Sequence, residues 1–103
     1  MAESKTPKIE HLMQVIREHV EDGRYLDTRH VLDRQSERKI FRPEILYVLR
    51  HGYHEKRQDR YAKEFQAWNY SVRGKTIDKR DLRVIVSFEK SQLVMITAID
   101  LDA

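Results

Sequence analysis

Leu82-Arg-Val-Ile-Val-Ser-Phe-Glu-Lys-Ser-Gln-Leu-Val-Met-Ile-Thr-Ala-Ile-Asp-Leu101 is the most hydrophobic stretch of the chain. It predicts two strands joined by a tight turn at residues 89–92, because apolar side chains alternate along a half-buried strand. One face of the first strand carries Leu82, Val84, Val86 and Phe88. The second strand is apolar on both faces, with Leu93, Met95, Ile99 and Leu101 on one and Val94, Ile96 and Ala98 on the other. This predicts a central strand, paired with residues 82–89 on one side and with an early strand or another chain on its other side.

The preceding sequence predicts helices that cover this sheet. Thr6 is a candidate N-cap with Pro7 at the first helical position. A buried stripe then recurs at helical spacing, formed by Ile9, Leu12, Met13, Ile16 and Val20. Gly23 predicts the end of this helix.

Two further helices are predicted. One begins at Asp27-Thr28 and continues to about Lys39, with few apolar residues. Ile40-Phe41 is expected to turn two apolar side chains inward. The other helix runs from Pro43 to His51, has a broad apolar face and stops at Gly52.

The region after the third helix is less determined. Residues 53–63 are compatible with an edge strand and loop or with a short amphipathic helix. Residues 64–73 predict a strand, with Trp68, Tyr70 and Val72 on one face, and Gly74-Lys75 predicts the start of a turn. The expected fold class is α+β, with N-terminal helices packed on one face of a three- to four-stranded, mostly antiparallel sheet.

Composition limits the class of protein. A chain of 103 residues is expected to form one α+β domain over residues 24–103, preceded by a helical extension over residues 1–23. Cysteine is absent, which excludes disulfides and cysteine-based zinc sites. The N-terminus has no apolar run typical of a signal peptide, and no stretch approaches the roughly 20 apolar residues of a membrane span. We therefore expect a soluble, cytoplasmic protein that does not bind membranes.

Positive charge is concentrated in the middle of the chain. Residues 34–63 carry nine Lys or Arg against four Asp or Glu, a net +5, whereas residues 1–33 carry five against seven and residues 64–103 carry six against six. A local basic patch is expected of a protein with an anionic partner such as RNA. The candidate nucleic-acid-binding residues are His54, Lys56, Arg57, Arg60, Lys63 and Trp68. The alternative is an ordinary solvated surface.

One predicted helix face could carry chemistry. His30, Arg34 and Arg38 recur at i, i+4 and i+8 and so line one side of a helix. RNA cleavage without a metal needs a proton-transfer group, for which histidine is suited, and fixed positive charge beside the phosphate. Tyr70 and Arg83 are candidate supporting catalytic groups. The alternative is a surface helix whose arginines pair with neighbouring carboxylates.

No cofactor or metal is expected. His51 and His54 straddle a helix stop without further ligands at a recognisable spacing. Residues 73–76 lack the first glycine of a phosphate-binding loop.

The chain resembles a known family in several places. The run Thr28-Arg-His30-Val-Leu-Asp-Arg34-Gln-Ser-Glu-Arg38-Lys-Ile40 resembles the pattern Thr/Ser-x-His-Ala-x-x-Arg-x-x-x-Arg-Gly-Ile. The helix ending at Gly52 and the segments around Gly74, Leu82 and Thr97 follow in the expected order. Together they resemble the bacterial "domain of unknown function 4258" family over residues 24–101. Val31 departs from the small residue of that pattern, and Lys39 from its glycine.

The resemblance implies a small α+β fold similar to RelE and barnase-type toxin nucleases, although a shared fold does not assign an activity. The first functional hypothesis is therefore an RNA-directed, toxin-like protein with metal-independent ribonuclease activity and an antitoxin-like partner. The alternative is a non-catalytic module that binds nucleic acid or protein through the basic surface of residues 34–63. The sequence does not predict the oligomeric state.

Overall fold

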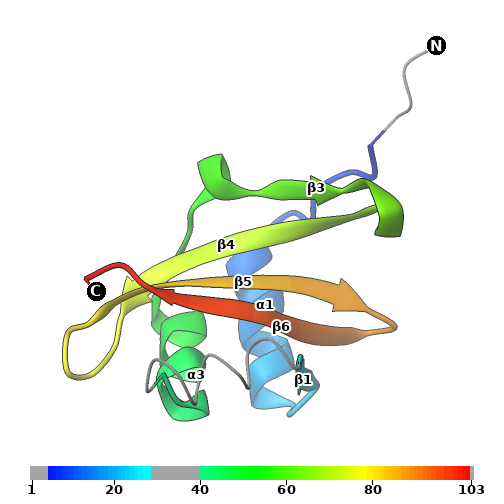
Figure 1. Ribbon diagram of the computed structural model, residues 1–103. Coiled ribbons are helices and arrows are strands. Elements are labelled where there is room, and N and C mark those ends of the chain that lie inside the picture. The colour runs from blue at the N-terminus through cyan, green and yellow to red at the C-terminus, as the bar shows by residue number, and fades with distance from the viewer. Residues whose placement is uncertain (1–4, 29–39, 103) are drawn as a thin grey trace.

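The computed structural model describes residues 5–28 and 40–102. Its strands are β1 (Tyr25–Asp27), β2 (Tyr53–His54), β3 (Arg60–Ala62), β4 (Ala67–Lys75), β5 (Asp81–Glu89) and β6 (Gln92–Asp100). They form one sheet in the order β1-β6-β5-β4-β2, with β3 also paired to β4. The helices α1 (Leu12–Glu21) and α3 (Arg42–His51) both lie behind this sheet (Figure 1). The predicted α+β class is confirmed, with six strands where three or four were expected.

The terminal hairpin forms as predicted. Strands β5 and β6 are antiparallel and are joined at Lys90 and Ser91, whose φ angles of 48° and 65° are both left-handed. Two positive φ angles match the twist of a two-residue hairpin turn. The alternating residues Leu82, Val84 and Val86 of β5 are completely buried. Local alternation was therefore sufficient to place this strand.

The predicted faces of β6 are wrong beyond its middle. Ile85 pairs with Thr97 but Val86 pairs with Met95, so Ile96 is an extra residue in a β-bulge. A bulge shifts the alternation by one residue. Ala98 is consequently buried in the core, whereas Ile99 is 39% exposed.

The central position predicted for β6 is confirmed. Its partners are β5 on one side and the early strand β1 on the other, in parallel register. The second apolar face of β6 turns away from the helices. There Val94 and Ile96 line a hollow of about 650 Å³ together with Phe65.

Helix α1 begins at Leu12, five residues later than the predicted start at Pro7. Residues 5–9 are not helical, because Thr6 is held by tertiary hydrogen bonds: its hydroxyl donates to the Gln66 carbonyl at 2.9 Å. The predicted stripe packs into the common core through Leu12, Ile16 and Val20. Gly23 follows the helix at φ 69°, which confirms its predicted role.

Helix α3 has the predicted position and apolar face, with Ile45, Val48 and Leu49 fully buried. Its stop at Gly52 has a different cause from the expected left-handed backbone, since φ there is −80°. A Cβ at Gly52 would lie 2.5 Å from the Arg73 carbonyl oxygen. Close packing of the helix end on β4 therefore requires glycine.

Two details near the helices differ from the predictions. Ile40 is fully buried as expected, but Phe41 is 52% exposed and does not turn inward. The turn predicted at residues 74–75 lies later, because Gly74 and Lys75 continue β4 opposite Leu82 and Asp81.

Residues 53–66, whose conformation the sequence did not decide, form two short strands and two 3-10 helices. Strand β2 is followed by the short 3-10 helix η1 (Lys56–Gln58), then β3, then the 3-10 helix η2 (Lys63–Phe65). The strand predicted from Glu64 therefore begins at Ala67. Within the two described ranges, no helix is long and apolar enough to cross a membrane.

Candidate nucleic-acid interface

Residues 53–65, which we call the basic edge, run along the margin of the sheet beyond β4. Both β2 and β3 pair antiparallel with β4, at its second half and its first half respectively. The turn η1 bridges the two pairings. The edge thus pairs with β4 along one side, and several of its charged residues are exposed to solvent.

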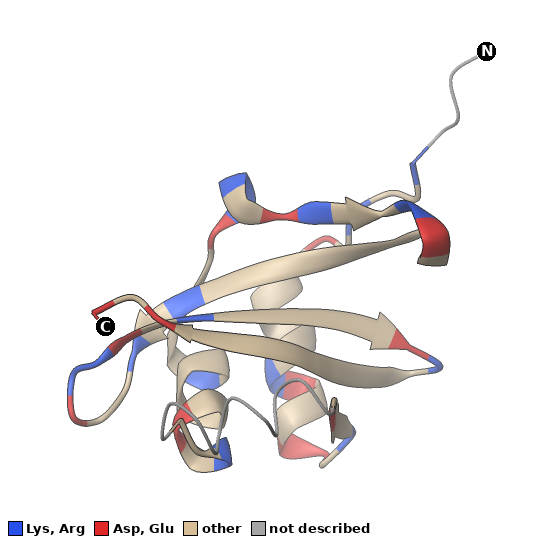
Figure 2. Ribbon diagram, viewed as in Figure 1, with Lys and Arg blue, Asp and Glu red and all other residues tan. Residues whose placement is uncertain are grey.

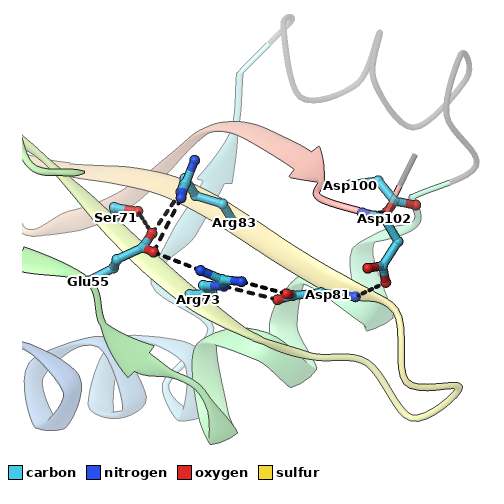
Figure 3. Close-up of polar contacts among 7 residues, drawn as sticks. All are labelled: Glu55, Ser71, Arg73, Asp81, Arg83, Asp100 and Asp102. Carbon is cyan, nitrogen blue, oxygen red and sulfur yellow. Dashed lines mark hydrogen bonds and ion pairs between the residues drawn. The ribbon is translucent and has the colours of Figure 1, made fainter. Parts of the chain in front are cut away.

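The first acidic residue of the basic edge points inward. Glu55 accepts hydrogen bonds from Arg83 Nε at 2.7 Å, from Ser71 Oγ at 3.1 Å and from Arg73 Nη1 at 3.3 Å (Figure 3). Its side chain is 14% exposed. The Arg83 guanidinium is the main reason that the pKa of Glu55 lies below its usual value. Glu55 is therefore an internal anion and does not offset charge on the outer surface.

The same cluster extends along β4 and β5. Arg73 forms a two-point ion pair with Asp81, with Nη2 to Oδ2 at 2.8 Å and Nε to Oδ1 at 3.2 Å (Figure 3). This pair is the main reason that the pKa of Asp81 is lowered. The Asp81 amide in turn donates to Asp102 at 2.9 Å. Arg73 and Arg83 are thus both ion-paired with carboxylates of the chain itself.

The second acidic residue of the basic edge is also internal. The side chain of Asp59 is fully buried and accepts from Ser71 N at 3.0 Å through Oδ1. Its Oδ2 accepts from His54 Nε2 at 2.7 Å and from Lys8 Nζ at 2.9 Å. A buried carboxylate with three donors is well satisfied. Asp59 therefore ties the basic edge to the segment before α1.

The cations of the basic edge point outward. Lys56, Arg57 and Arg60 are exposed and form no ion pair with the rest of the described chain. In Figure 2 the ribbon from η1 to β3 carries blue Lys and Arg positions as well as red Asp and Glu positions. Between residues 53 and 63 the fold engages both carboxylates, Glu55 and Asp59, in internal contacts and leaves these three cations exposed, whereas Glu64 on η2 is exposed. Lys63 is exposed on η2 at the end of the same edge.

A cavity lies on the helix side of the basic edge. It has a volume of about 800 Å³ and extends from the segment before α1 to η1. The polar residues that line it are Lys8, Glu10, His11, Gln14, His54 and Lys56. His54, a predicted nucleic-acid-binding residue, thus lines a cavity together with a second histidine.

Trp68 has a role that the sequence did not predict. Its Nε1 donates to the Thr6 carbonyl at 2.6 Å, and the ammonium groups of Lys5 and Lys8 lie 5.4 and 4.5 Å from its ring centroid. Such cation–π contacts hold the N-terminal segment on the ring. This face of Trp68 is therefore covered by the chain itself, and a base would need to displace a lysine to stack there.

Tyr70 and Arg83, which the sequence suggested as supporting catalytic groups, lie on opposite faces of the sheet. Tyr70 lies opposite Val86 on the helix face, is 3% exposed, and its hydroxyl accepts from the Ile9 amide at 2.9 Å. Burial raises the pKa of Tyr70. Arg83 lies opposite Arg73 on the other face, with Nε and Nη2 both directed at Glu55. The sheet separates these two side chains, so they do not converge on one site.

The remaining predicted residues, His30, Arg34 and Arg38, fall within residues 29–39 and lie outside the described residues. The roles predicted for them stay predictions. Sequence reasoning missed four other groups near the basic edge: Lys8, His11, Glu55 and Asp59. Lys8 and His11 are distant in sequence from the edge, and no local pattern indicates that they meet it. Glu55 and Asp59 did have a signal in the sequence, because they are the only acidic residues between Tyr53 and Lys63.

The fold and this edge define a small α+β protein in which Lys56, Arg57 and Arg60, exposed and without an ion pair to any described residue, lie beside a cavity lined by two histidines. The chain belongs to the family described as Domain of unknown function (DUF4258), whose model matches residues 28–100. The match includes the whole basic edge and begins after α1 and β1. No curated protein matches the chain.

Proposed function

We propose that this protein binds single-stranded nucleic acid along the basic edge. The observation that supports this is the separation of charge: Glu55 and Asp59 are engaged internally, while Lys56, Arg57 and Arg60 are exposed and unpaired among the described residues. A row of unpaired cations attracts phosphates because binding releases condensed counterions.

Exposed aromatic residues favour a single strand as the ligand. Tyr53 is 55% exposed and Phe65 is 79% exposed, one at each end of the basic edge. Unpaired bases stack on aromatic rings, and this stacking contributes about 1–3 kcal/mol per base. A duplex would hold its bases in the helix and could not use these rings.

An acidic protein partner, including an antitoxin-like one, is less well supported. Stable protein interfaces depend on a central cluster of desolvated apolar and aromatic side chains. The residues of η1 are Lys56, Arg57 and Gln58, which provide no such centre.

The salt dependence of binding tests the proposal. Three neutralised phosphates on a single strand predict a slope of about −2 for log K against log salt. The variant K56Q/R57Q/R60Q should reduce affinity for a fluorescent oligouridine and bring the slope towards zero.

A matched control removes the same charge elsewhere. Lys75, Lys79 and Lys90 are exposed residues at strand ends and turns outside the basic edge. The variant K75Q/K79Q/K90Q should retain both affinity and slope. An equal loss of affinity in the two triple variants would mean that only net charge matters, and it would refute the proposed site. Binding that does not depend on salt would also refute it. Preferential binding of an acidic peptide over the oligouridine would favour the protein-binding alternative.

A further inference from the structure

The cavity beside the basic edge has the elements of a proton-transfer site. It contains two histidines from different parts of the chain, His11 just before α1 and His54 at the end of β2. Lys56 adds an exposed cation at the cavity, and Glu10 adds a carboxylate. Lys8 also lines the cavity, with its ammonium on Asp59.

Asp59 orients the imidazole of His54. Because an ionised carboxylate only accepts hydrogen bonds, the proton between them belongs to His54 Nε2, which lies 2.7 Å from Asp59 Oδ2. A neutral ring held in this way presents an unprotonated Nδ1, which has no hydrogen-bond partner in the described part of the chain. The ring is also packed edge-on against Tyr70 at 5.8 Å between centroids. The His54 side chain, which is 11% exposed, is therefore held in one orientation.

His11 is placed differently. It is exposed and precedes α1 in the left-handed conformation, at φ 54°, without a capping hydrogen bond from its side chain. Its imidazole is therefore available to a ligand. The unpaired amides at the start of a helix carry partial positive charge, which favours an anion at this end of the cavity.

We propose that this cavity cleaves single-stranded RNA without a metal, an inference that rests on the nucleic-acid binding proposed above. His54 Nδ1 takes the proton of a 2′-hydroxyl, and the resulting 2′-oxygen forms a bond to the adjacent phosphorus. The bond from phosphorus to the 5′-oxygen breaks, and protonated His11 gives its proton to that leaving oxygen. The products are a 2′,3′-cyclic phosphate and a 5′-hydroxyl, so atoms and charge balance without another reactant.

The surrounding charges fit this step. Negative charge grows on the phosphate oxygens as the fifth bond forms, and Lys56 with the amino end of α1 supplies positive charge at the same cavity. The proposed proton-transfer residues differ from His30, the residue that the sequence analysis predicted for this role. Both proposed proton-transfer groups lie within the described residues.

The test uses the full chain with a single-stranded oligoribonucleotide in the presence of a chelator. His54→Gln removes the proton acceptor, and His11→Asn removes the second imidazole while retaining a residue that tolerates a left-handed backbone. Each should reduce cleavage by about 100-fold or more, as expected for a lost proton-transfer group. His51→Asn is the matched control, because His51 is exposed on α3 and does not line the cavity.

The pH profile separates catalysis from folding. The unsubstituted protein should show a bell-shaped rate profile, with the acidic limb lost in His54→Gln and the alkaline limb lost in His11→Asn. A purely structural role for His54 would lower stability in urea and leave the shape of the profile unchanged, which would refute the assignment.

A second measurement distinguishes failure of cleavage from failure of binding. The corresponding oligodeoxyribonucleotide lacks the attacking hydroxyl and reports affinity alone. Binding without cleavage of RNA overturns the catalytic inference and leaves the proposed binding intact, whereas failure to bind either oligonucleotide overturns both. Equal cleavage by all variants, or products without a cyclic phosphate, would also refute this mechanism.

Discussion

Replacing Glu55 with glutamine should destabilise the fold and disturb the basic edge together. Glu55 immediately precedes η1, and its carboxylate accepts from Arg83, Arg73 and Ser71. Hydrogen bonds to a charged group contribute about 1.5–3 kcal/mol when buried, and exposed ion pairs contribute about 0.2–1 kcal/mol. Because this cluster is partly exposed, and glutamine keeps one acceptor oxygen, we expect a loss of about 2 kcal/mol in the free energy of unfolding.

This loss is measurable by urea denaturation followed by circular dichroism. For a domain of this size, about 2 kcal/mol corresponds to a fall of about 8–16 °C in Tm. Glu89→Gln is the control, because Glu89 is exposed and forms no ion pair within the described residues. It should change the free energy of unfolding by less than about 0.5 kcal/mol.

The pH dependence follows from the lowered pKa of Glu55. A carboxyl whose pKa is lower in the folded state stabilises the fold fully above its ordinary value of 4.5, and this stabilisation is lost as pH falls through the folded value. The difference between the unsubstituted protein and Glu55→Gln should therefore be complete at pH 7 and shrink below pH 4.5.

Two results would contradict this account of Glu55. One is a stability difference that stays constant as the solution is acidified through that range. The other is a loss at neutral pH no larger than that of Glu89→Gln. In either case the ion pairs of Glu55 with Arg83 and Arg73 would add nothing measurable to the free energy of unfolding. If the account holds, binding of the oligouridine should weaken in the same variant, because η1 loses its anchor.

Three further predictions concern single positions. Gly52→Ala should lower the free energy of unfolding by about 2–3 kcal/mol in urea, since the new methyl group meets the Arg73 carbonyl at 2.5 Å; an unchanged midpoint would show that the helix end shifts freely. Ser91→Gly should raise Tm by a few degrees, about 0.5–1 kcal/mol, by relieving the left-handed backbone of the turn, and a lower Tm would disprove this. Asp59→Asn should alter the emission of Trp68, the sole tryptophan, as Lys8 loses its carboxylate partner, and should cost about 2 kcal/mol; unchanged emission would mean that the N-terminal segment does not depend on this contact.

Local patterns were sufficient for much of the fold. Alternation in β5 and the 3.6-residue period in α1 and α3 identified core residues directly, because the same side chains that favour each element also form its buried face. The pattern failed where one residue interrupted it. The bulge at Ile96 reversed the faces of β6 beyond that point, and no local feature of the sequence distinguishes Ile96 from its neighbours.

The first turn of the predicted N-terminal helix illustrates a different limit. Thr6 and Pro7 have favourable residue types for a helix start, yet Thr6 is instead held by Gln66 and Trp68, some 60 positions away. A few long-range hydrogen bonds and cation–π contacts outweigh the small intrinsic preference for a helix start. Such competition depends on the folded partner, so propensity alone could not predict it.

The sequence by itself determined an α+β class, a central hydrophobic hairpin, and an excess of positive charge in the middle of the chain. Only the tertiary structure decided where that charge is presented. In the sequence, Glu55 and Asp59 alternate with Lys56, Arg57 and Arg60, and the local charge is nearly balanced. Folding places both carboxylates beside internal donors and leaves the cations in solvent, because a carboxylate is desolvated only where ion pairs and hydrogen bonds compensate for lost hydration.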